Sequence, residues 1–332
     1  MRIVLCYPVE PHHVERIAAA APNAEVVNAG QEHIAELLPT ADVYCGHAKV
    51  PVPWDETVAG GRLRWIQSSA AGMDHCLVPE VIASNIAVSS ASGILAEQVL
   101  DHTIALLLGS LRSLPVFFRA QQQREFIRRP TRDLSGATVG IVGLGGNGRR
   151  MAEVLAAFGT KILATDYFPE RKPDYVQWLG AADELDTLLP QVDSLILALP
   201  LSEQTRGLID REKIARMRPG ATLVNVARGG IFVGEDLVDA VESGHMAGAA
   251  VDVNEVEPLP AESRLWDAPG ALITPHVGGQ RASRIDDMTD LFCENLRRYQ
   301  AGQRLINACD KRLGFPHPAD SLWLSRAGKV ER

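Results

Sequence analysis

Short apolar runs alternate with amphipathic stretches along most of the chain. In the first hundred residues, four runs have the length of buried strands, and the segments 11–22 and 31–39 repeat apolar residues at helical spacing. Strands that alternate with helices predict βαβ units and therefore a parallel sheet. The predicted strands are residues 2–8, 41–47, 63–69 and 86–92.

The pattern changes between Leu95 and Gln123, where apolar residues continue at helical spacing almost without interruption. This stretch holds more leucine than a helix with one buried face requires, and a bend is expected near Pro115. We therefore predict a connector that packs between domains or subunits. Its Glu97 and His102 are expected to be structural residues.

Alternation resumes with six more predicted strands, and helical segments lie between most of them. Six strands with crossovers predict a second doubly wound parallel sheet, of the dinucleotide-binding type. A last helix is expected at 284–302, and the polar tail from Asp310 onward is expected to pack loosely. The six strands are 137–143, 161–166, 194–200, 221–227, 247–253 and 271–275.

Length and composition limit the number of domains, the class of protein and its possible partners. A chain of 332 residues is longer than a single hydrophobic core usually accommodates, which predicts two domains. A hydrophobic fraction of 46% is typical of a globular protein, and no apolar run reaches membrane-spanning length. The net charge of −8 argues against a nucleic-acid partner. Five scattered cysteines predict neither a disulfide framework nor a metal site, and with no signal-peptide pattern the cytoplasm is expected.

A glycine loop follows the first strand of the second sheet. Gly143, Gly145 and Gly148 form G-x-G-x-x-G between a predicted strand and a predicted helix. Gly143 permits a tight turn, Gly145 lets the backbone approach a pyrophosphate, and Gly148 allows close packing of helix and strand. Asp166 ends the next strand, where a carboxylate accepts hydrogen bonds from a ribose and repels a 2′-phosphate. NAD is therefore favoured over NADP.

Two alternatives stay open at this point. The motif is also compatible with a glycine-rich turn followed by a surface aspartate, and methyltransferases use glycine loops too.

Three polar residues stand just past apolar strands, where ligands bind in such sheets. Arg228 follows one strand, Glu257 lies shortly after the next, and His276 ends the last. The guanidinium of an arginine can grip a substrate carboxylate, and a protonated histidine can give its proton to a keto oxygen. A glutamate beside that histidine keeps it charged and oriented. Taken singly, these residues are equally compatible with a surface ion pair, a loop carboxylate and a structural histidine.

Four motifs together resemble the D-isomer-specific 2-hydroxyacid dehydrogenase family. "VGIVGLGGNG", "LVNVARGG", "DVNEVEPLP" and "TPHVGG" stand in the order and spacing of that family, and the resemblance runs from about residue 40 to about 310. It implies that Arg228 binds the substrate carboxylate, that His276 is the acid/base, and that Glu257 pairs with His276. It further implies cofactor contacts at Gly143, Gly145, Asn147, Gly148, Asp166, Ala227, Asp252 and Gly278, with Asp252 on the nicotinamide carboxamide.

The family resemblance also implies the architecture. Residues 1–98 and 285–332 would form a substrate-binding domain, and residues 99–284 an inserted NAD-binding Rossmann domain. A homodimer with the connector helices at its interface is expected. In the first domain, "QSSAAGMDH" resembles a loop whose backbone N–H groups meet the substrate carboxylate, and Ala71 and Gly72 would be the donors; a plain strand-to-helix turn is the alternative.

The expected substrate is a small 2-keto acid or the matching D-2-hydroxy acid, such as glyoxylate or hydroxypyruvate. Ser68 stands where phosphoglycerate-oxidising members carry a basic residue, which disfavours a phosphorylated substrate. Asn147 replaces a residue that is often aliphatic, and Glu257 argues against formate oxidation, which uses glutamine there. A phosphoglycerate dehydrogenase and a non-catalytic, NAD-sensing dimeric scaffold remain alternatives.

Overall fold

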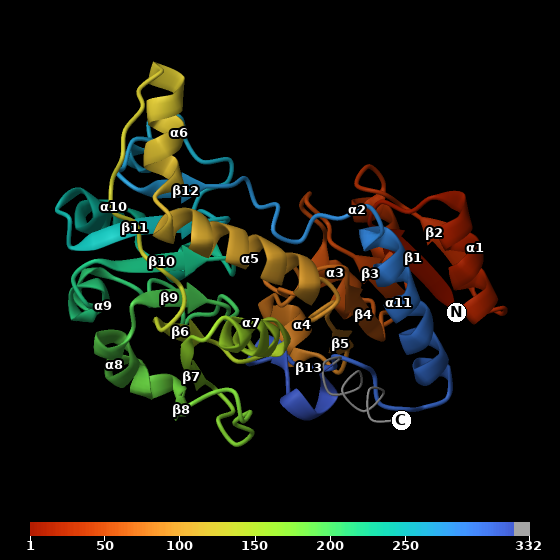
Figure 1. Cartoon of the computed structure of the whole chain (residues 1–332). Coiled ribbons are helices and arrows are strands. Elements are labelled where there is room, and N and C mark those ends of the chain that lie inside the picture. The colour runs from red at the N-terminus through yellow and green to blue at the C-terminus, as the bar shows by residue number, and fades with distance from the viewer. Residues whose placement is uncertain (322–332) are drawn as a thin grey trace. The chain divides into compact units, whose positions relative to one another are not determined.

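The computed structural model describes residues 1–321, and it divides into two compact units (Figure 1). The first unit consists of residues 1–95 together with the segment from residue 281 onward, and the second of residues 96–280. The second unit is thus inserted into the sequence of the first. Residues 322–332, which the sequence assigns to the substrate-binding domain, lie outside the described residues.

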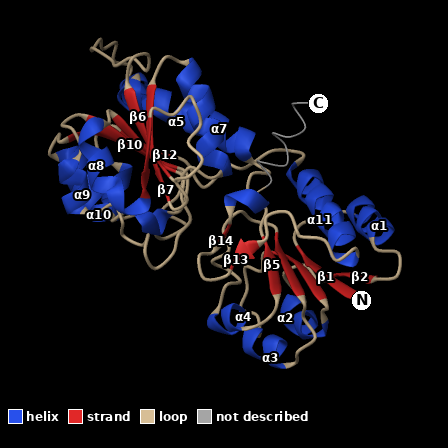
Figure 2. Ribbon diagram, turned by 90° about the horizontal axis from the view of Figure 1, so that it is seen from below, coloured by secondary structure: helices blue, strands red, loops and turns tan. Residues whose placement is uncertain are grey.

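The first unit is built on a five-stranded parallel sheet with the order β2-β1-β3-β4-β5. Helices cover both faces, with α1 and α11 on one side and α2, α3 and α4 on the other (Figure 2). Both faces are covered, so β1, β3 and β4 are buried along nearly their whole length, and β4 buries the polar Gln67 and Ser68 as well. The strands are β1 (Arg2–Cys6), β2 (Glu25–Asn28), β3 (Val43–Gly46), β4 (Trp65–Ser68) and β5 (Ala87–Ser89); the helices are α1 (Pro11–Ala20), α2 (Ile34–Leu37), α3 (Trp54–Ala59), α4 (Pro79–Ala83) and α11 (Arg284–Gln300).

The second unit is built on a seven-stranded parallel sheet with the order β12-β11-β10-β9-β6-β7-β8. Helices α5 and α7 cover one face, and α8, α9 and α10 cover the other (Figure 2). The strands are β6 (Thr138–Val142), β7 (Lys161–Asp166), β8 (Trp178–Ala181), β9 (Ser194–Leu197), β10 (Ala221–Asn225), β11 (Met246–Val251) and β12 (Ala271–Ile273); the helices are α5 (Ala96–Leu111), α6 (Leu114–Gln123), α7 (Gly146–Ala157), α8 (Leu185–Leu188), α9 (Arg211–Arg216) and α10 (Gly234–Glu242).

Both sheets confirm the predicted fold class, a pair of doubly wound parallel α/β units. In the second unit the strand order reverses between β6 and β9, and ligands bind at such a switch point, beyond the carboxyl ends of the strands. The carboxyl ends of β6, β10, β11 and β12 lead directly into the segments that hold the predicted cofactor and catalytic residues. The sheet therefore brings these segments to one edge.

The connector forms two helices rather than one continuous helix. α5 and α6 are bent by 68° relative to each other, and the break falls at Ser113, which has a left-handed φ of 57°. Pro115 lies two residues further on, and it lacks the N–H that a continuous helix would use. Among the described residues no single helix is long and apolar enough to span a membrane, and α5 and α6 reach that length only as this bent pair.

The described part of the tail is packed, contrary to the expectation of loose packing. β13 (Cys309–Asp310) and β14 (Phe315–Pro316) pair antiparallel. The Lys311 ammonium donates a hydrogen bond to the Val81 carbonyl (3.0 Å) in α4. Composition did not predict this packing, because these contacts use main-chain groups and one lysine rather than apolar side chains.

Candidate active site

The glycine loop has the shape of a pyrophosphate cradle. Gly143 has a φ of 94°, and a Cβ there would lie 2.8 Å from the Ala198 carbonyl oxygen. A Cβ on Gly148 would lie 2.0 Å from the Gly143 carbonyl oxygen, so only glycine lets the first turn of α7 pack this tightly. Gly145 has no atom within 4 Å of such a Cβ, so the backbone there is open to a ligand. These three positions fit a dinucleotide at the N-terminus of α7.

Asp166 lies at the end of β7 and braces this loop. Its carboxylate accepts hydrogen bonds from the backbone N–H groups of Leu144 (2.5 Å) and Phe168 (2.8 Å). Burial raises the pKa of the Asp166 carboxyl, while these two N–H groups and the nearby Arg149 oppose that shift. Asn147 is half-buried in the first turn of α7. Contact of the Asp166 carboxylate with a ribose hydroxyl stays a prediction, and part of its hydrogen-bonding capacity is already used by these two N–H groups.

His276 and Glu257 are in direct contact. His276 Nδ1 lies 2.8 Å from Glu257 Oε2, and the other carboxylate oxygen accepts a hydrogen bond from the Asn254 N–H (3.0 Å). An ionised carboxylate only accepts hydrogen bonds, so Nδ1 carries the proton and Nε2 is the ring atom available to a substrate. Both side chains are partly open to solvent, at 48% for His276 and 38% for Glu257. The arrangement can deliver or remove a proton at Nε2.

The backbone of His276 is held in an uncommon conformation. Its φ is 54°, a left-handed value that costs a residue with a side chain roughly 1–2 kcal/mol. Its N–H donates to the carbonyl oxygens of Asp252 (2.7 Å) and Thr274 (3.1 Å). These bonds, next to the rigid Pro275, fix the direction in which the imidazole leaves the chain.

Asp252 organises the loop that carries His276. It is 2% exposed, and its carboxylate accepts hydrogen bonds from Thr274 Oγ1 (2.7 Å) and from the N–H groups of Val277 (2.9 Å) and Gly278 (2.8 Å). A Cβ on Gly278 would lie 2.9 Å from Asp252 Oδ2, so this glycine makes room for the carboxylate. Sequence reasoning placed Asp252 and Gly278 against the cofactor, and the structure adds this internal role. Contact with a carboxamide stays a prediction.

Arg228 follows β10 in a loop held by Asn225, a residue that sequence reasoning missed. Asn225 is fully buried; its amide donates to the Arg228 carbonyl (2.9 Å), and its oxygen accepts from the Ala227 N–H (3.0 Å). A Cβ on Gly229 would lie 1.9 Å from the Asn254 carbonyl carbon. The Arg228 loop thus packs against the segment that leads to Glu257. An asparagine that ends an apolar run was the available signal.

The loop with Ala71 and Gly72 belongs to the first unit, whereas Arg228, Glu257 and His276 belong to the second. It follows β4, and there Ala71 is exposed and Gly72 half-buried. Ser68 Oγ accepts a hydrogen bond from the Ala70 N–H (3.0 Å), so this buried side chain bonds to its own loop. The proposed N–H donors are therefore presented on a braced turn.

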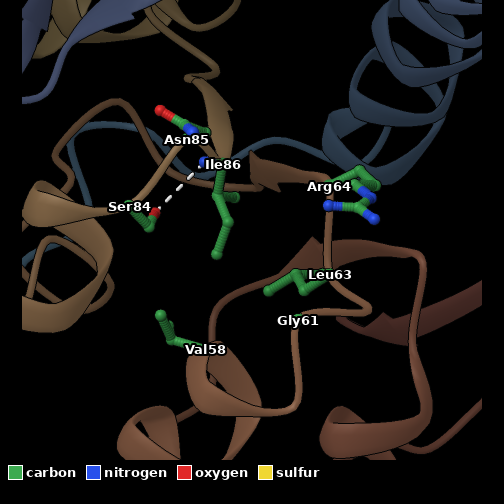
Figure 3. Close-up of a pocket in the computed structure, with 7 residues that line it drawn as sticks. All are labelled: Val58, Gly61, Leu63, Arg64, Ser84, Asn85 and Ile86. Carbon is green, nitrogen blue, oxygen red and sulfur yellow. Dashed lines mark hydrogen bonds between the residues drawn. The ribbon is translucent and has the colours of Figure 1, made fainter.

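The first unit has a pocket that involves none of the residues named above. A pocket of about 180 Å³ is lined by Val58, Leu63 and Ile86, and Ser84 Oγ accepts the Ile86 N–H there at 3.1 Å (Figure 3). None of the predicted catalytic residues lines it.

His12, His13 and Asp286 have metal-ligand spacing. His13 Nδ1, however, accepts a hydrogen bond from the Glu10 N–H (3.0 Å), so Nε2 carries the proton and faces Asp286 at 3.4 Å. Arg16 also pairs with Asp286 at 2.8 Å. This group is therefore best described as an Arg16–Asp286 ion pair with two neighbouring histidines.

Comparison with known proteins identifies the family. Residues 104–278, more than half of the chain, match the family model "D-isomer specific 2-hydroxyacid dehydrogenase, NAD binding domain". The chain belongs to the D-isomer specific 2-hydroxyacid dehydrogenase family. The resemblance stated from the four sequence motifs is thereby confirmed. The match covers the glycine loop, Arg228, Glu257 and His276.

Relatives within this family differ in their named substrates. The chain is 30% identical over 296 residues to the D-3-phosphoglycerate dehydrogenase of Mycobacterium tuberculosis, and the alignment covers 88% of this chain and 56% of that protein. The chain therefore spans little more than half the length of that relative. It is 35% identical over 240 residues to the (S)-sulfolactate dehydrogenase of Chromohalobacter salexigens, which covers 71% of this chain and 77% of that protein.

Among solved structures of the family, the NADPH-dependent glyoxylate/hydroxypyruvate reductase of Sinorhizobium meliloti, in complex with NADP and sulfate, is 27% identical. It matches with a TM-score of 0.80 and covers 95% of this chain and 99% of that chain. The fold of this 2-hydroxyacid dehydrogenase family member is thus shared along nearly its whole length.

Proposed function

We propose that this protein is an oxidoreductase that interconverts a small 2-keto acid and the matching D-2-hydroxy acid with NAD(H). The observation that carries the proposal is the contact between His276 Nδ1 and Glu257 Oε2 on a loop beside Arg228. Membership of the 2-hydroxyacid dehydrogenase family supports it.

Each residue takes a distinct role in the direction of reduction. Arg228 binds the substrate carboxylate through its planar guanidinium. NADH, when bound, supplies a hydride to the keto carbon. His276 gives the proton on Nε2 to the keto oxygen, which becomes the hydroxyl of the product. Glu257 holds the imidazole by Nδ1 and stabilises its protonated form. In the reverse direction the same Nε2 accepts the hydroxyl proton.

Glyoxylate and hydroxypyruvate are the substrates we favour. The Sinorhizobium meliloti structure, named for both, supports this choice. Oxidation of 3-phosphoglycerate is the second candidate, because relatives of that name align over 88% of this chain. A phosphate at C3 requires a cationic partner, and Ser68 bonds to its own loop instead of supplying one.

We further propose NAD as the preferred cofactor, because the Asp166 carboxylate would repel a 2′-phosphate. The cited S. meliloti structure contains NADP, so the preference needs a direct measurement. A scaffold that only senses the dinucleotide would need the glycine loop. It would not need an acid/base pair beside an arginine, and on this ground we rank it below the enzyme.

A homodimer is also proposed, formed through the surface of α6 and the segment that follows it. Phe118 is 51% exposed and Phe126 is 90% exposed on this surface. Ile127 is also exposed, at 42%, and exposed apolar side chains that are grouped in this way are typical of interaction sites. The cytoplasm is the proposed compartment, because the five cysteines are free thiols.

The deciding experiment is a steady-state assay with 2-keto acids that differ at C3. Glyoxylate, hydroxypyruvate, phosphohydroxypyruvate and sulfopyruvate would each be tested with NADH and with NADPH. We expect the highest kcat/KM for glyoxylate or hydroxypyruvate with NADH. A higher kcat/KM for phosphohydroxypyruvate would select the second candidate, and no turnover of any 2-keto acid would contradict the proposal.

A further inference from the structure

His102 connects helix α5 to the loop that carries His276. The sequence assigned it a structural role in the connector, but its ring reaches the active-site edge of the sheet. Its Nε2 lies 2.8 Å from Thr274 Oγ1 and 3.1 Å from Asp252 Oδ1. Its side chain is 20% exposed. A residue 174 positions before His276 therefore takes part in the hydrogen bonds of that loop.

The protons in this network can be assigned. Thr274 donates its single O–H to Asp252 Oδ1 (2.7 Å), so Thr274 Oγ1 can only accept from the histidine. His102 Nε2 must therefore carry a proton and act as the donor. The same proton is within reach of Asp252 Oδ1, and this histidine is one of four donors around a carboxylate that is nearly fully buried.

The network determines where His276 stands. Asp252 accepts the N–H groups of Val277 and Gly278 on its carboxylate, and that of His276 on its main-chain oxygen. These bonds form the turn in which His276 adopts its left-handed φ. Gly278 allows this close approach, since a Cβ there would lie 3.3 Å from His102 Cδ2. A shift of Asp252 or Thr274 would thus be passed to the catalytic imidazole.

We propose that His102 is a positioning residue for the reaction: through Thr274 and Asp252 it fixes the loop that presents His276 Nε2 to the substrate. The inference rests on the proposed function. It predicts that kcat depends on the hydrogen-bond donor at Nε2 and does not depend on the volume of the ring. A displacement of about 1 Å at a reacting group lowers turnover by about 100-fold, so a positioning residue can affect kcat strongly without touching the substrate.

Three substitutions separate the donor from the ring. In His102→Gln, an amide N–H takes nearly the position of Nε2. In His102→Asn, the amide N–H lies near the position of Nδ1, too far from Thr274 and Asp252 to replace the donor. His102→Leu removes the donor and keeps an apolar side chain of similar volume. We expect His102→Leu and His102→Asn to lower kcat about 10- to 100-fold. We expect His102→Gln to restore most of kcat, with the KM for the keto acid little changed in all three. His245→Ala is the control, because His245 Nε2 hydrogen-bonds to the Ile214 carbonyl (3.0 Å) in α9 rather than to the loop that carries His276.

Amide hydrogen exchange, followed by mass spectrometry over residues 274–280, gives a readout that is independent of activity. His102→Leu and His102→Asn should lose protection in this segment, while the wild type, His102→Gln and His245→Ala should retain it. If this pattern holds in a protein that reduces no 2-keto acid, the proposed function fails and the positioning role stands. Wild-type kcat and protection in His102→Leu would overturn the inference. Equal losses in the Gln and Leu variants would also overturn it, because a packing defect would then explain both.

Discussion

At the scale of single residues, His276 shows how a conformation and a contact together define chemistry. The left-handed φ of 54° fixes the direction of the ring, and the contact with Glu257 fixes which nitrogen carries the proton. Neither property is visible in the letters "TPHVGG". The motif indicated that a histidine stands at a strand end, and the structure indicates which of its atoms is available.

His276→Ala removes the proposed proton donor. We expect turnover to fall by roughly 100- to 10,000-fold, the usual size of an acid/base contribution. NADH should still bind, because the glycine loop is untouched. Steady-state kinetics and a fluorescence titration with NADH measure the two effects. Near-normal turnover in this variant would rule out the proposed role of His276.

Asp166→Ala tests the choice of cofactor. Loss of the carboxylate removes its repulsion of a 2′-phosphate, so the ratio of kcat/KM for NADH to that for NADPH should fall about 10-fold or more. The ratio does not depend on the fraction of folded enzyme, which is useful because Asp166 also accepts two backbone N–H groups. Glu170→Ala is the control, since Glu170 is an exposed carboxylate close by. An unchanged ratio in Asp166→Ala would refute the ribose assignment.

At the scale of elements, the turn between β6 and α7 shows two separate uses of glycine. Gly148 is required by the protein itself, because a Cβ there would collide with the Gly143 carbonyl. Gly145 has open space around it and a φ of −70°, which alanine adopts readily. If Gly145 serves a ligand rather than the fold, the same substitution at the two positions should have opposite consequences.

Gly145→Ala should therefore unfold at nearly the wild-type temperature but bind NADH at least about tenfold more weakly, because its methyl group blocks the close approach of a pyrophosphate. Gly148→Ala should lose about 1–3 kcal/mol of folding stability, as overpacking commonly does. Thermal unfolding and NADH titration of both variants measure this. Unchanged NADH affinity in Gly145→Ala would count against a dinucleotide in this loop.

Some helices, strands and contacts of this fold were predictable from the sequence, and others were not. The strands in the middle of each sheet were predictable, because burial on both faces leaves apolar runs. β2 and β8 were missed: each has only four residues and lies at a sheet edge, and β8 includes Gly180. The pairing of His276 with Glu257 was expected from the motifs. The contact of His102 with Asp252 was not, since a histidine at helical spacing in an apolar stretch gives no sign of a partner 150 residues away.

At the scale of the whole molecule, exposed aromatic residues point to association. Phe126→Asp puts a charge in the middle of the proposed interface of α6, where Phe126 is 90% exposed. We expect the wild type to sediment as a dimer and this variant to shift toward the monomer, because a buried, unpaired carboxylate opposes association. Phe158→Asp is the control at an exposed phenylalanine beyond α7. A monomeric wild type would contradict the proposed dimer.

The insertion of the second unit into the first has a consequence for synthesis on the ribosome. Helix α11 completes the first unit: Phe292 is fully buried there, with its ring 5.4 Å from that of Trp65 in β4. All five strands of that sheet emerge before the 185 residues of the second unit are translated, which takes roughly 10–40 s at usual rates of elongation. During that interval Trp65 lacks the contact with Phe292. α1 covers part of the same sheet face, so the nascent chain exposes the apolar surface that α11 later buries, and we expect any chaperone that binds the nascent chain to do so at this stage.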